Sequence, residues 1–395
     1  MSSVGVGSSD AMTVLVLQGG GALGAYQAGA FEALAAQGRE PGWVAGISIG
    51  AINGALVAGN PPERRVERLR TFWDLVTGGM PSMPLAIAAG PLRAWANDWS
   101  AAWGATVGLP GFFMPRPVAE FWPSGGGGPS YYDTAPLHAT LTELVDFDLL
   151  NDGATRLSVG AVDVETGNFA YFDNRTTRIG PEHVMASGAL PPGFPPVPID
   201  GRWYWDGGLV SNTPLRPVLE ATAGGEVTIF QVDLYSARGP LPQTMAQVAE
   251  REKDIRYSSR TRAVTDMLRE RHEAHRRLQA VAAMLPADRR ADPQVQRWLA
   301  EAKEASITLV HLIRRRLDGE TETKDYEFSR TSMLDHWQAG ARDMAHALAA
   351  LGPVTRKSAP GEFRVFDFGL PTQKPKARGP RRDSEADMDG CNDPC

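Results

Sequence analysis

The sequence predicts a three-layer α/β/α fold around a mainly parallel central sheet, with helical insertions, and three observations support this prediction. Short apolar runs that break into glycines, such as residues 13–18, are typical of buried parallel strands. These runs alternate with helix-forming segments such as residues 25–38, whose last residue, Gly38, is a typical helix terminator. The chain also has 395 residues, of which 43% are hydrophobic and 22% are charged, which is enough for a sizeable core.

Further strands are expected where apolar and β-branched residues recur between turn residues. The segment 43–48 follows the first helix, and a helix of small residues is expected after it, up to Gly59. Because these strands alternate with helices, we expect them to form one mainly parallel sheet. Later strands are expected at residues 156–166, 168–174, 226–235 and 306–315.

Shifts in composition divide the chain into regions. We expect a flexible, Gly/Ser-rich N-terminus at residues 1–11 and a main α/β domain at residues 12–240. A segment rich in Pro, Gly, Trp and Met at residues 78–130 is interpreted as a lid or insertion of that domain. A charged, mostly helical extension packed on the main domain is expected at residues 241–352. The tail at residues 370–395 has almost no apolar content and is expected to be disordered.

Charge and cysteine usage limit the partners and the compartment. The formal net charge of −6 gives no global attraction to nucleic acid, so no nucleic-acid partner is expected. Both cysteines, Cys391 and Cys395, lie at the C-terminal end, which suits a reducing compartment. No Lys or Arg precedes Arg39, so the basic start of a signal peptide is missing, and the apolar run 44–59 is shorter than the ~20 residues that span a bilayer. We therefore expect a cytoplasmic protein that is able to touch a membrane surface peripherally.

A serine framed by glycines lies between the second strand and the helix after it. Gly46, Ser48 and Gly50 match the pattern G-x-S-x-G, in which a nucleophilic serine occupies a sharp strand-to-helix turn. The residues two before and two after the serine must lack bulk so that the turn can close, and the helix N-terminus favours negative charge at the serine. The alternative is that Ser48 is only the N-cap of a close-packed helix.

The glycine-rich stretch 18–24 follows the first strand and opens the first helix. Consecutive glycine N–H groups at such a place are able to hold an oxyanion, as a serine nucleophile requires. The candidate donors are Gly19, Gly20 and Gly21.

The same stretch also matches the dinucleotide-binding pattern G-x-G-x-x-G through Gly19, Gly21 and Gly24. That site needs an acidic residue at the end of the second strand to bind the ribose. Here the strand ends in Gly-Ile-Ser, and Glu40 precedes it. An NAD(P)-binding oxidoreductase is therefore kept as an alternative.

A candidate base lies in residues 202–215, where Asp206 follows an aromatic cluster and precedes Gly207 and Gly208. Partly apolar surroundings raise the proton affinity of a carboxylate toward that of a general base. The alternative is an ordinary Asp-Gly turn of a hairpin. None of the seven histidines lies in a glycine-framed loop, and the best of them, His183, lies in a helix-forming stretch.

Taken together, three blocks resemble the patatin-like phospholipase family: the glycine loop at 18–24, the serine turn at 46–50 and the D-G-G motif at 206–208. The resemblance implies a Ser-Asp dyad without histidine, with Ser48 as nucleophile and Asp206 as base. It also implies a serine lipid acyl hydrolase that needs no metal and no cofactor and that cleaves lipid or other acyl esters through an acyl-enzyme. The oxyanion donors that it implies are Gly19, Gly20 and Gly21.

The resemblance covers roughly residues 13–235 and includes a small-residue and proline block at 186–197. Many relatives carry a basic residue that steadies the glycine loop, where this chain has Leu23. The part from about 240 to 350 resembles an uncharacterised extension of some bacterial members. A catalytically inactive scaffold remains a further alternative.

The Trp- and Phe-rich stretch 80–123 adds one expectation from the residues themselves. Its aromatic side chains suit an apolar lid or an acyl groove, and a second small core is the alternative. The residues concerned are Trp95, Trp99, Trp103, Phe112, Phe113, Phe121 and Trp122.

Overall fold

The structure is a computed structural model. Two predictions fall outside the described residues: the flexible N-terminus at residues 1–11 and the disordered tail with Cys391 and Cys395. Phe121 and Trp122 also lie outside them. The structure describes residues 12–79, 91–117, 129–222, 225–259, 261–301, 305–317, 319–352 and 362–368.

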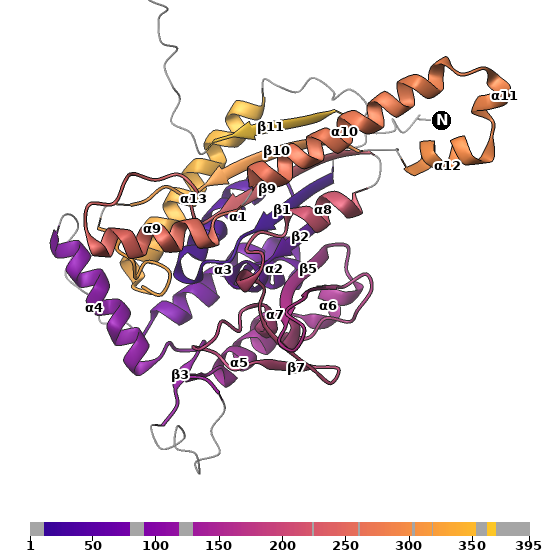
Figure 1. The fold of residues 1–395 in the computed structure, drawn as a ribbon. Coiled ribbons are helices and arrows are strands. Elements are labelled where there is room, and N and C mark those ends of the chain that lie inside the picture. The colour runs from indigo at the N-terminus through magenta and orange to yellow at the C-terminus, as the bar shows by residue number, and fades with distance from the viewer. Residues whose placement is uncertain are drawn as a thin grey trace, which may run out of the picture.

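A twisted, mainly parallel sheet forms the centre of the molecule (Figure 1). Its strands follow the order β11-β10-β9-β1-β2-β5-β8-β7, and β6 pairs with β5. The six strands from β11 to β5 run parallel, whereas β6, β7 and β8 pair antiparallel at the other end. The strands are β1 (Met12–Leu17), β2 (Trp43–Gly46), β5 (Arg156–Asp163), β6 (Phe169–Asp173), β7 (Val197–Ile199), β8 (Arg202–Asp206), β9 (Glu226–Asp233), β10 (Ser306–Ile313) and β11 (Phe363–Asp367); β3 (Met114–Pro115) and β4 (Tyr132–Asp133) pair separately.

Helices cover both faces of this sheet, which confirms the predicted three layers. In α10 to α12 the chain projects beyond the body of the molecule (Figure 1). The helices are α1 (Ala25–Ala35), α2 (Ile49–Ala58), α3 (Pro62–Thr77), α4 (Pro91–Val107), α5 (Ala135–Leu144), α6 (Phe147–Asp152), α7 (Pro181–Ser187), α8 (Leu215–Ala221), α9 (Met245–Tyr257), α10 (Thr261–Met284), α11 (Ala287–Arg290), α12 (Pro293–Glu301) and α13 (Arg330–Leu351). No helix in the described ranges is both long and apolar enough to cross a membrane.

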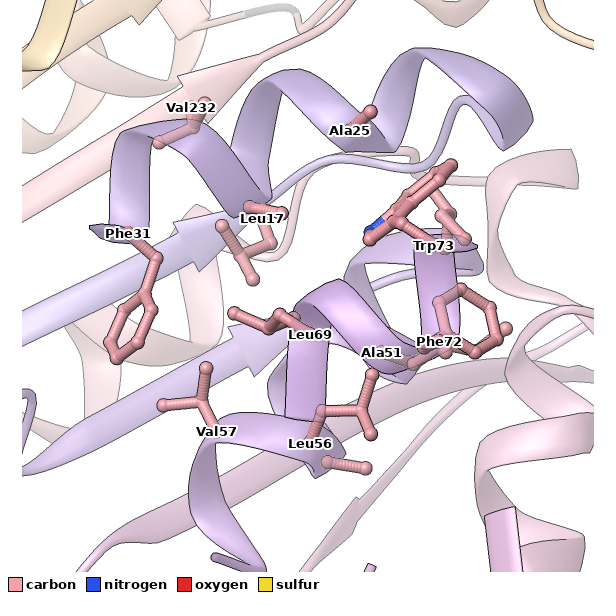
Figure 2. Close-up of a cluster of buried hydrophobic side chains, with 14 of the residues drawn as sticks. Leu17, Ala25, Phe31, Ala51, Leu56, Val57, Leu69, Phe72, Trp73 and Val232 are labelled. Atoms are coloured by element: carbon pink, nitrogen blue, oxygen red, sulfur yellow. The ribbon is translucent and has the colours of Figure 1, made fainter. Parts of the chain in front are cut away.

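The alternation of side chains along β1 shows why a continuous apolar run forms a central strand. Leu15 and Leu17 pack into the large core under α1, α2, α3 and α13, whereas Val14 and Val16 pack into a second core with α8. Because successive side chains of a strand point to opposite faces, a strand covered on both faces needs apolar residues at every position. Figure 2 shows part of the larger core, in which Leu17 faces side chains of α1, α2 and α3.

The strands predicted at six places are all present, with ends that shift by up to three residues. The strands β7, β8 and β11 were not predicted, because they are short or rich in Pro, Trp and Arg and therefore lack an apolar run. The two-residue strands β3 and β4 were not predicted either. The first helix ends at Ala35 rather than at Gly38, and Gly38 takes a φ of 67° in the turn that follows.

Two glycines let α1 and α13 pack backbone to backbone. A Cβ added at Gly29 would overlap the carbonyl oxygen of Trp337, and one added at Gly340 would overlap the carbonyl oxygen of Tyr26. The contact is therefore reciprocal, and each helix needs a glycine opposite the backbone of the other. It fastens the C-terminal region to the first helix of the main domain.

Candidate active site

Ser48 occupies a strained turn between β2 and α2. Its φ of 54° and ψ of −122° are unusual for a residue with a side chain and cost about 1–3 kcal/mol. A Cβ added at Gly46 would overlap the carbonyl oxygen of Gly50, and one added at Gly50 would overlap the carbonyl oxygen of Leu17. Both glycines are therefore required for the turn to close, as the sequence pattern predicts.

The alternative role of Ser48, a helix cap, does not fit this geometry. Ser48 stands at the N-cap position of α2, yet its side chain makes no capping hydrogen bond. Its backbone N–H donates to Oγ of Ser187 at 3.0 Å, and that hydroxyl donates to the carbonyl of Gly160 at 2.6 Å. Ser187 thus holds the turn from α7, which leaves the hydroxyl of Ser48 on the side of the cavity.

The pairing of β8 with β5 brings Asp206 level with Ser48. Gly46 pairs with Val159 of β5, and Asp206 pairs with Ala161, two residues further along the same strand. Ser48 lies two residues beyond Gly46, so the two side chains meet across the edge of β5. The motif residue Gly207 is needed here because a Cβ on it would lie 2.6 Å from a carbonyl oxygen of β5.

Asp206 is the last residue of β8 and is 3% exposed. Its Oδ1 accepts a hydrogen bond from the N–H of Gly208 at 2.7 Å, and the Ser48 hydroxyl lies within hydrogen-bonding reach of the carboxylate. Burial raises the pKa of Asp206 to about 6, against the two hydrogen bonds, which lower it. A carboxylate with this pKa is ionised at neutral pH and still takes up a proton far more readily than an exposed one.

The glycine loop packs directly against the serine turn. A Cβ on Gly19 would lie 3.1 Å from the Cβ of Ser48. The N–H of Gly19 donates to the carbonyl of Asn212 at 3.2 Å, and Nδ2 of Asn212 donates back to the carbonyl of Gly19 at 3.1 Å. The N–H groups of Gly20 and Gly21 donate to no acceptor within the part of the chain that the structure describes, and both residues line the cavity. Two of the three predicted donors are thus available for an oxyanion, whereas that of Gly19 is used to fix the loop.

A cavity of about 380 Å³ joins these groups to an apolar wall. Phe112 and Phe113 of the predicted acyl groove belong to this wall, but Trp95, Trp99 and Trp103 do not. These tryptophans lie on α4 and are 59%, 39% and 38% exposed. The apolar and aromatic lining residues are Ile49, Ile52, Ala105, Phe112, Phe113, Tyr132, Leu137, Leu190, Phe194, Tyr235, Tyr257, Tyr326 and Phe328.

Among the described residues that line this cavity there is no histidine. His183 lies in α7, where its Nδ1 accepts a hydrogen bond from the N–H of Gly180 at 2.9 Å, and burial lowers its pKa. Among the described residues no cluster of three or more His, Cys, Asp or Glu side chains is arranged to hold a metal ion. The strand β2 leads directly into Ser48, so the acidic residue that a dinucleotide site needs at its tip is replaced by the serine.

The sequence patterns did not predict the roles of three residues that support the site, Ser187, Asn212 and Asp325. Ser187 and Asn212 lie inside blocks that were singled out, at 186–197 and 202–215, but nothing in the sequence indicated which member would support the turn or the loop. Asp325 lines the cavity from the C-terminal region and carried no signal, because its role depends on contacts between distant parts of the chain.

Two family models match the chain. The model described as patatin-like phospholipase matches residues 15–219, and one described as patatin phospholipase matches residues 255–359. The chain belongs to the patatin-like phospholipase family. This membership places it in a family of lipid acyl hydrolases and confirms the family that the three sequence blocks indicated.

Among solved structures, this patatin-like chain is similar to VipD from Legionella pneumophila, with a TM-score of 0.38 and 14% sequence identity over 87% of this chain and 67% of that one. No curated protein matches it. The two matched regions of the patatin-like chain meet at the cavity: Ser48 and Asp206 lie in the first, and Asp325, Tyr326 and Phe328 lie in the second.

Proposed function

We propose that the protein is a serine lipid acyl hydrolase that cleaves carboxylic esters with a Ser48–Asp206 dyad. The observation that supports this most directly is the position of the strained Ser48 hydroxyl within hydrogen-bonding reach of one buried carboxylate whose pKa is about 6. The glycine loop adds two backbone donors beside the serine, and the apolar cavity adds a place for an acyl chain.

In the acylation half of the reaction, Oγ of Ser48 attacks the ester carbonyl carbon while its proton passes to Asp206. The carbonyl oxygen becomes an oxyanion, which the N–H groups of Gly20 and Gly21 stabilise. When the tetrahedral intermediate collapses, the bond to the alcohol oxygen breaks and Asp206 returns the proton to that oxygen. The alcohol departs, and the acyl group remains on the enzyme as an ester of Oγ of Ser48.

Deacylation repeats the same steps with water. Asp206 takes a proton from water as the water oxygen attacks the acyl carbon, and the oxyanion returns to the same two donors. Collapse expels Oγ of Ser48, which recovers its proton from Asp206, and the free acid departs. The dyad therefore ends the cycle in the state in which it began.

The shape of the cavity supports a lipid substrate. The ring centroid of Phe112 lies 6.0 Å from that of Phe194 and 5.9 Å from that of Phe328, so rings from three separate segments form an apolar wall. Burial of an acyl chain against such a wall contributes about 0.8 kcal/mol for each methylene group removed from water. The cavity is thus suited to the hydrocarbon part of a lipid ester, with the ester carbonyl at Ser48.

The pH dependence of the reaction follows from the role of Asp206 as base. Only the ionised carboxylate accepts the serine proton, so kcat/KM is expected to rise with pH and to level off above an inflection near pH 6. A pH profile measured with an ester whose leaving group does not titrate checks this. An activity that instead falls as the pH rises through 6 contradicts a base role for Asp206.

A fluorophosphonate probe tests the proposal as a whole. An activated serine attacks the phosphorus and keeps the phosphonyl group, so labelling is expected at Ser48 and is expected to be lost in Ser48→Ala. Ser258, which caps the C-terminal end of α9 and is half-buried like Ser48, provides a matched serine, and Ser258→Ala should label like the parent. Absence of labelling in the folded parent would support the alternative of a catalytically inactive scaffold.

A further inference from the structure

A turn of the C-terminal region at residues 321–326 lies directly against the glycine loop. The N–H of Ala22 donates to the carbonyl oxygen of Asp325 at 2.8 Å. Gly21 has a φ of 55°, and a Cβ on it would overlap the same carbonyl oxygen. The loop and the turn therefore meet backbone to backbone, next to the two N–H groups assigned to the oxyanion.

Lys253 of α9 binds this turn at two places, Glu322 and Asp325. Its Nζ donates to Oδ1 of Asp325 at 2.8 Å and to the carbonyl of Glu322 at 2.7 Å, and it lies 5.0 Å from the ring centroid of Tyr326. The side chains of Lys253 and Asp325 are only 23% and 20% exposed. Screening by water is weaker at such a pair than at a surface ion pair, so its attraction holds the turn more firmly.

The helix α9 is itself fastened to the turn and to the glycine loop. Nζ of Lys324 donates to Oδ1 of Asp254 at 2.6 Å, an ion pair in the reverse direction from turn to helix. At the end of α9, the carbonyl of Tyr257 accepts hydrogen bonds from the side chains of Gln18 and Asn212, at 3.1 and 2.8 Å. Gln18 precedes Gly19, and Asn212 donates a hydrogen bond to the carbonyl of Gly19. The helix is therefore fixed relative to the glycine loop, and Lys253 binds the turn from this fixed position.

We propose that Lys253 is a positioning residue for the hydrolysis described above. Through Asp325 it keeps the glycine loop in the conformation in which the N–H groups of Gly20 and Gly21 meet the oxyanion. Lys253 is not among the residues that line the cavity, so it acts through the turn and not on the substrate.

The inference rests on the proposed function for its kinetic consequence. Lys253→Met removes the charge and keeps the length of the side chain, so kcat for a soluble p-nitrophenyl ester is expected to fall roughly 10- to 100-fold, with KM within about twofold. Lys253→Arg keeps the charge and should retain most of kcat. Arg277→Met removes an exposed cation that pairs with Glu273 on α10, and serves as the control without effect.

Amide hydrogen exchange provides a second measurement, which does not depend on enzymatic activity. Peptides that contain residues 19–24 are expected to exchange at least about tenfold faster in Lys253→Met than in the parent, because the amide of Ala22 loses its fixed acceptor. Asp325→Asn breaks the same ion pair and keeps the backbone carbonyl. It should reproduce both effects, and the double variant should add little to either single one.

The outcomes separate this inference from the proposed function. Unchanged exchange at residues 19–24, or a kcat within twofold of the parent in folded Lys253→Met or Asp325→Asn, overturns the positioning role. A second outcome is that exchange is faster in Lys253→Met while the parent neither hydrolyses esters nor labels at Ser48. That result supports the contact between turn and loop but overturns the proposed function. A lower melting temperature with unchanged kcat in the folded fraction shows a purely structural ion pair and also overturns the inference.

Discussion

Asp206→Asn is expected to lower kcat by at least about 10³-fold and, at the same time, to make the protein more stable at pH 8. The loss of activity follows because an amide cannot take the proton of Ser48. The gain in stability follows from burial, which raises the pKa of Asp206 from 3.8 to about 6. Ionising this carboxyl inside the folded protein costs about 3 kcal/mol relative to ionising it in the unfolded chain.

The sign of the stability effect depends on pH. The contribution of Asp206 to stability is fully present well below pH 3.8, where the carboxyl is neutral in both the folded and the unfolded state, and it is lost as the pH rises through about 6. Asparagine is neutral throughout, and its Oδ1 can still accept the hydrogen bond of Gly208. The difference in the free energy of unfolding between variant and parent should therefore grow by about 2 kcal/mol from pH 4 to pH 8.

Urea unfolding at the two pH values and ester hydrolysis at pH 8 measure the two effects. Ser48→Ala should lose as much activity as Asp206→Asn without the pH-dependent gain in stability. Asp148→Asn, at an exposed carboxylate of α6, should leave both unchanged. If folded Asp206→Asn keeps normal turnover, Asp206 is not the base.

Ser48 and Asp206, the residues of the proposed dyad, could be singled out in the sequence because each lies in a local pattern with a geometric cause. Gly46 is required by an overlap within the turn itself, and the N–H of Gly208 donates to Asp206 two residues away; the overlap that requires Gly50 is with Leu17 of the neighbouring strand β1. The strands β1, β2 and β5 beside the site were also predictable, because strands buried on both faces need continuous apolar runs.

The supports of the site were not predictable, because they come from distant parts of the chain. Asn212 and Asp325 reach the glycine loop only through the order of the strands and the packing of α9, and their own neighbourhoods in the sequence carry no pattern for this role. For the same reason the sequence assigned an oxyanion role to Gly19, whose N–H the structure shows bonded to Asn212.

Gly340→Leu is expected to lower the free energy of unfolding by about 3 kcal/mol or more. A side chain at this position would overlap the backbone of α1 at Tyr26, and neither helix can move aside without opening the core between α1 and α13. Loss of glycine flexibility stabilises the helix slightly, but by roughly 1 kcal/mol at most, so the overlap dominates.

Gly352→Leu is the matched control, because the exposed Gly352 follows the same helix and a Cβ there would meet no atom of the described residues within 4 Å. Its stability should stay within about 1 kcal/mol of that of the parent. Urea denaturation of the three proteins compares them directly. Equal stability of Gly340→Leu and the parent would mean that α1 and α13 are not in backbone contact.

The hydrogen bond from Ala22 to Asp325 joins one of the first loops of the chain to one of its last turns. During synthesis, the ribosome releases the serine and its acid well before it releases the carbonyl that fixes the loop beside them. A nascent or truncated chain would therefore carry both reactive groups without a settled oxyanion site. Under the proposed mechanism, ester hydrolysis would begin only after residue 325 has been synthesised and has folded against the loop.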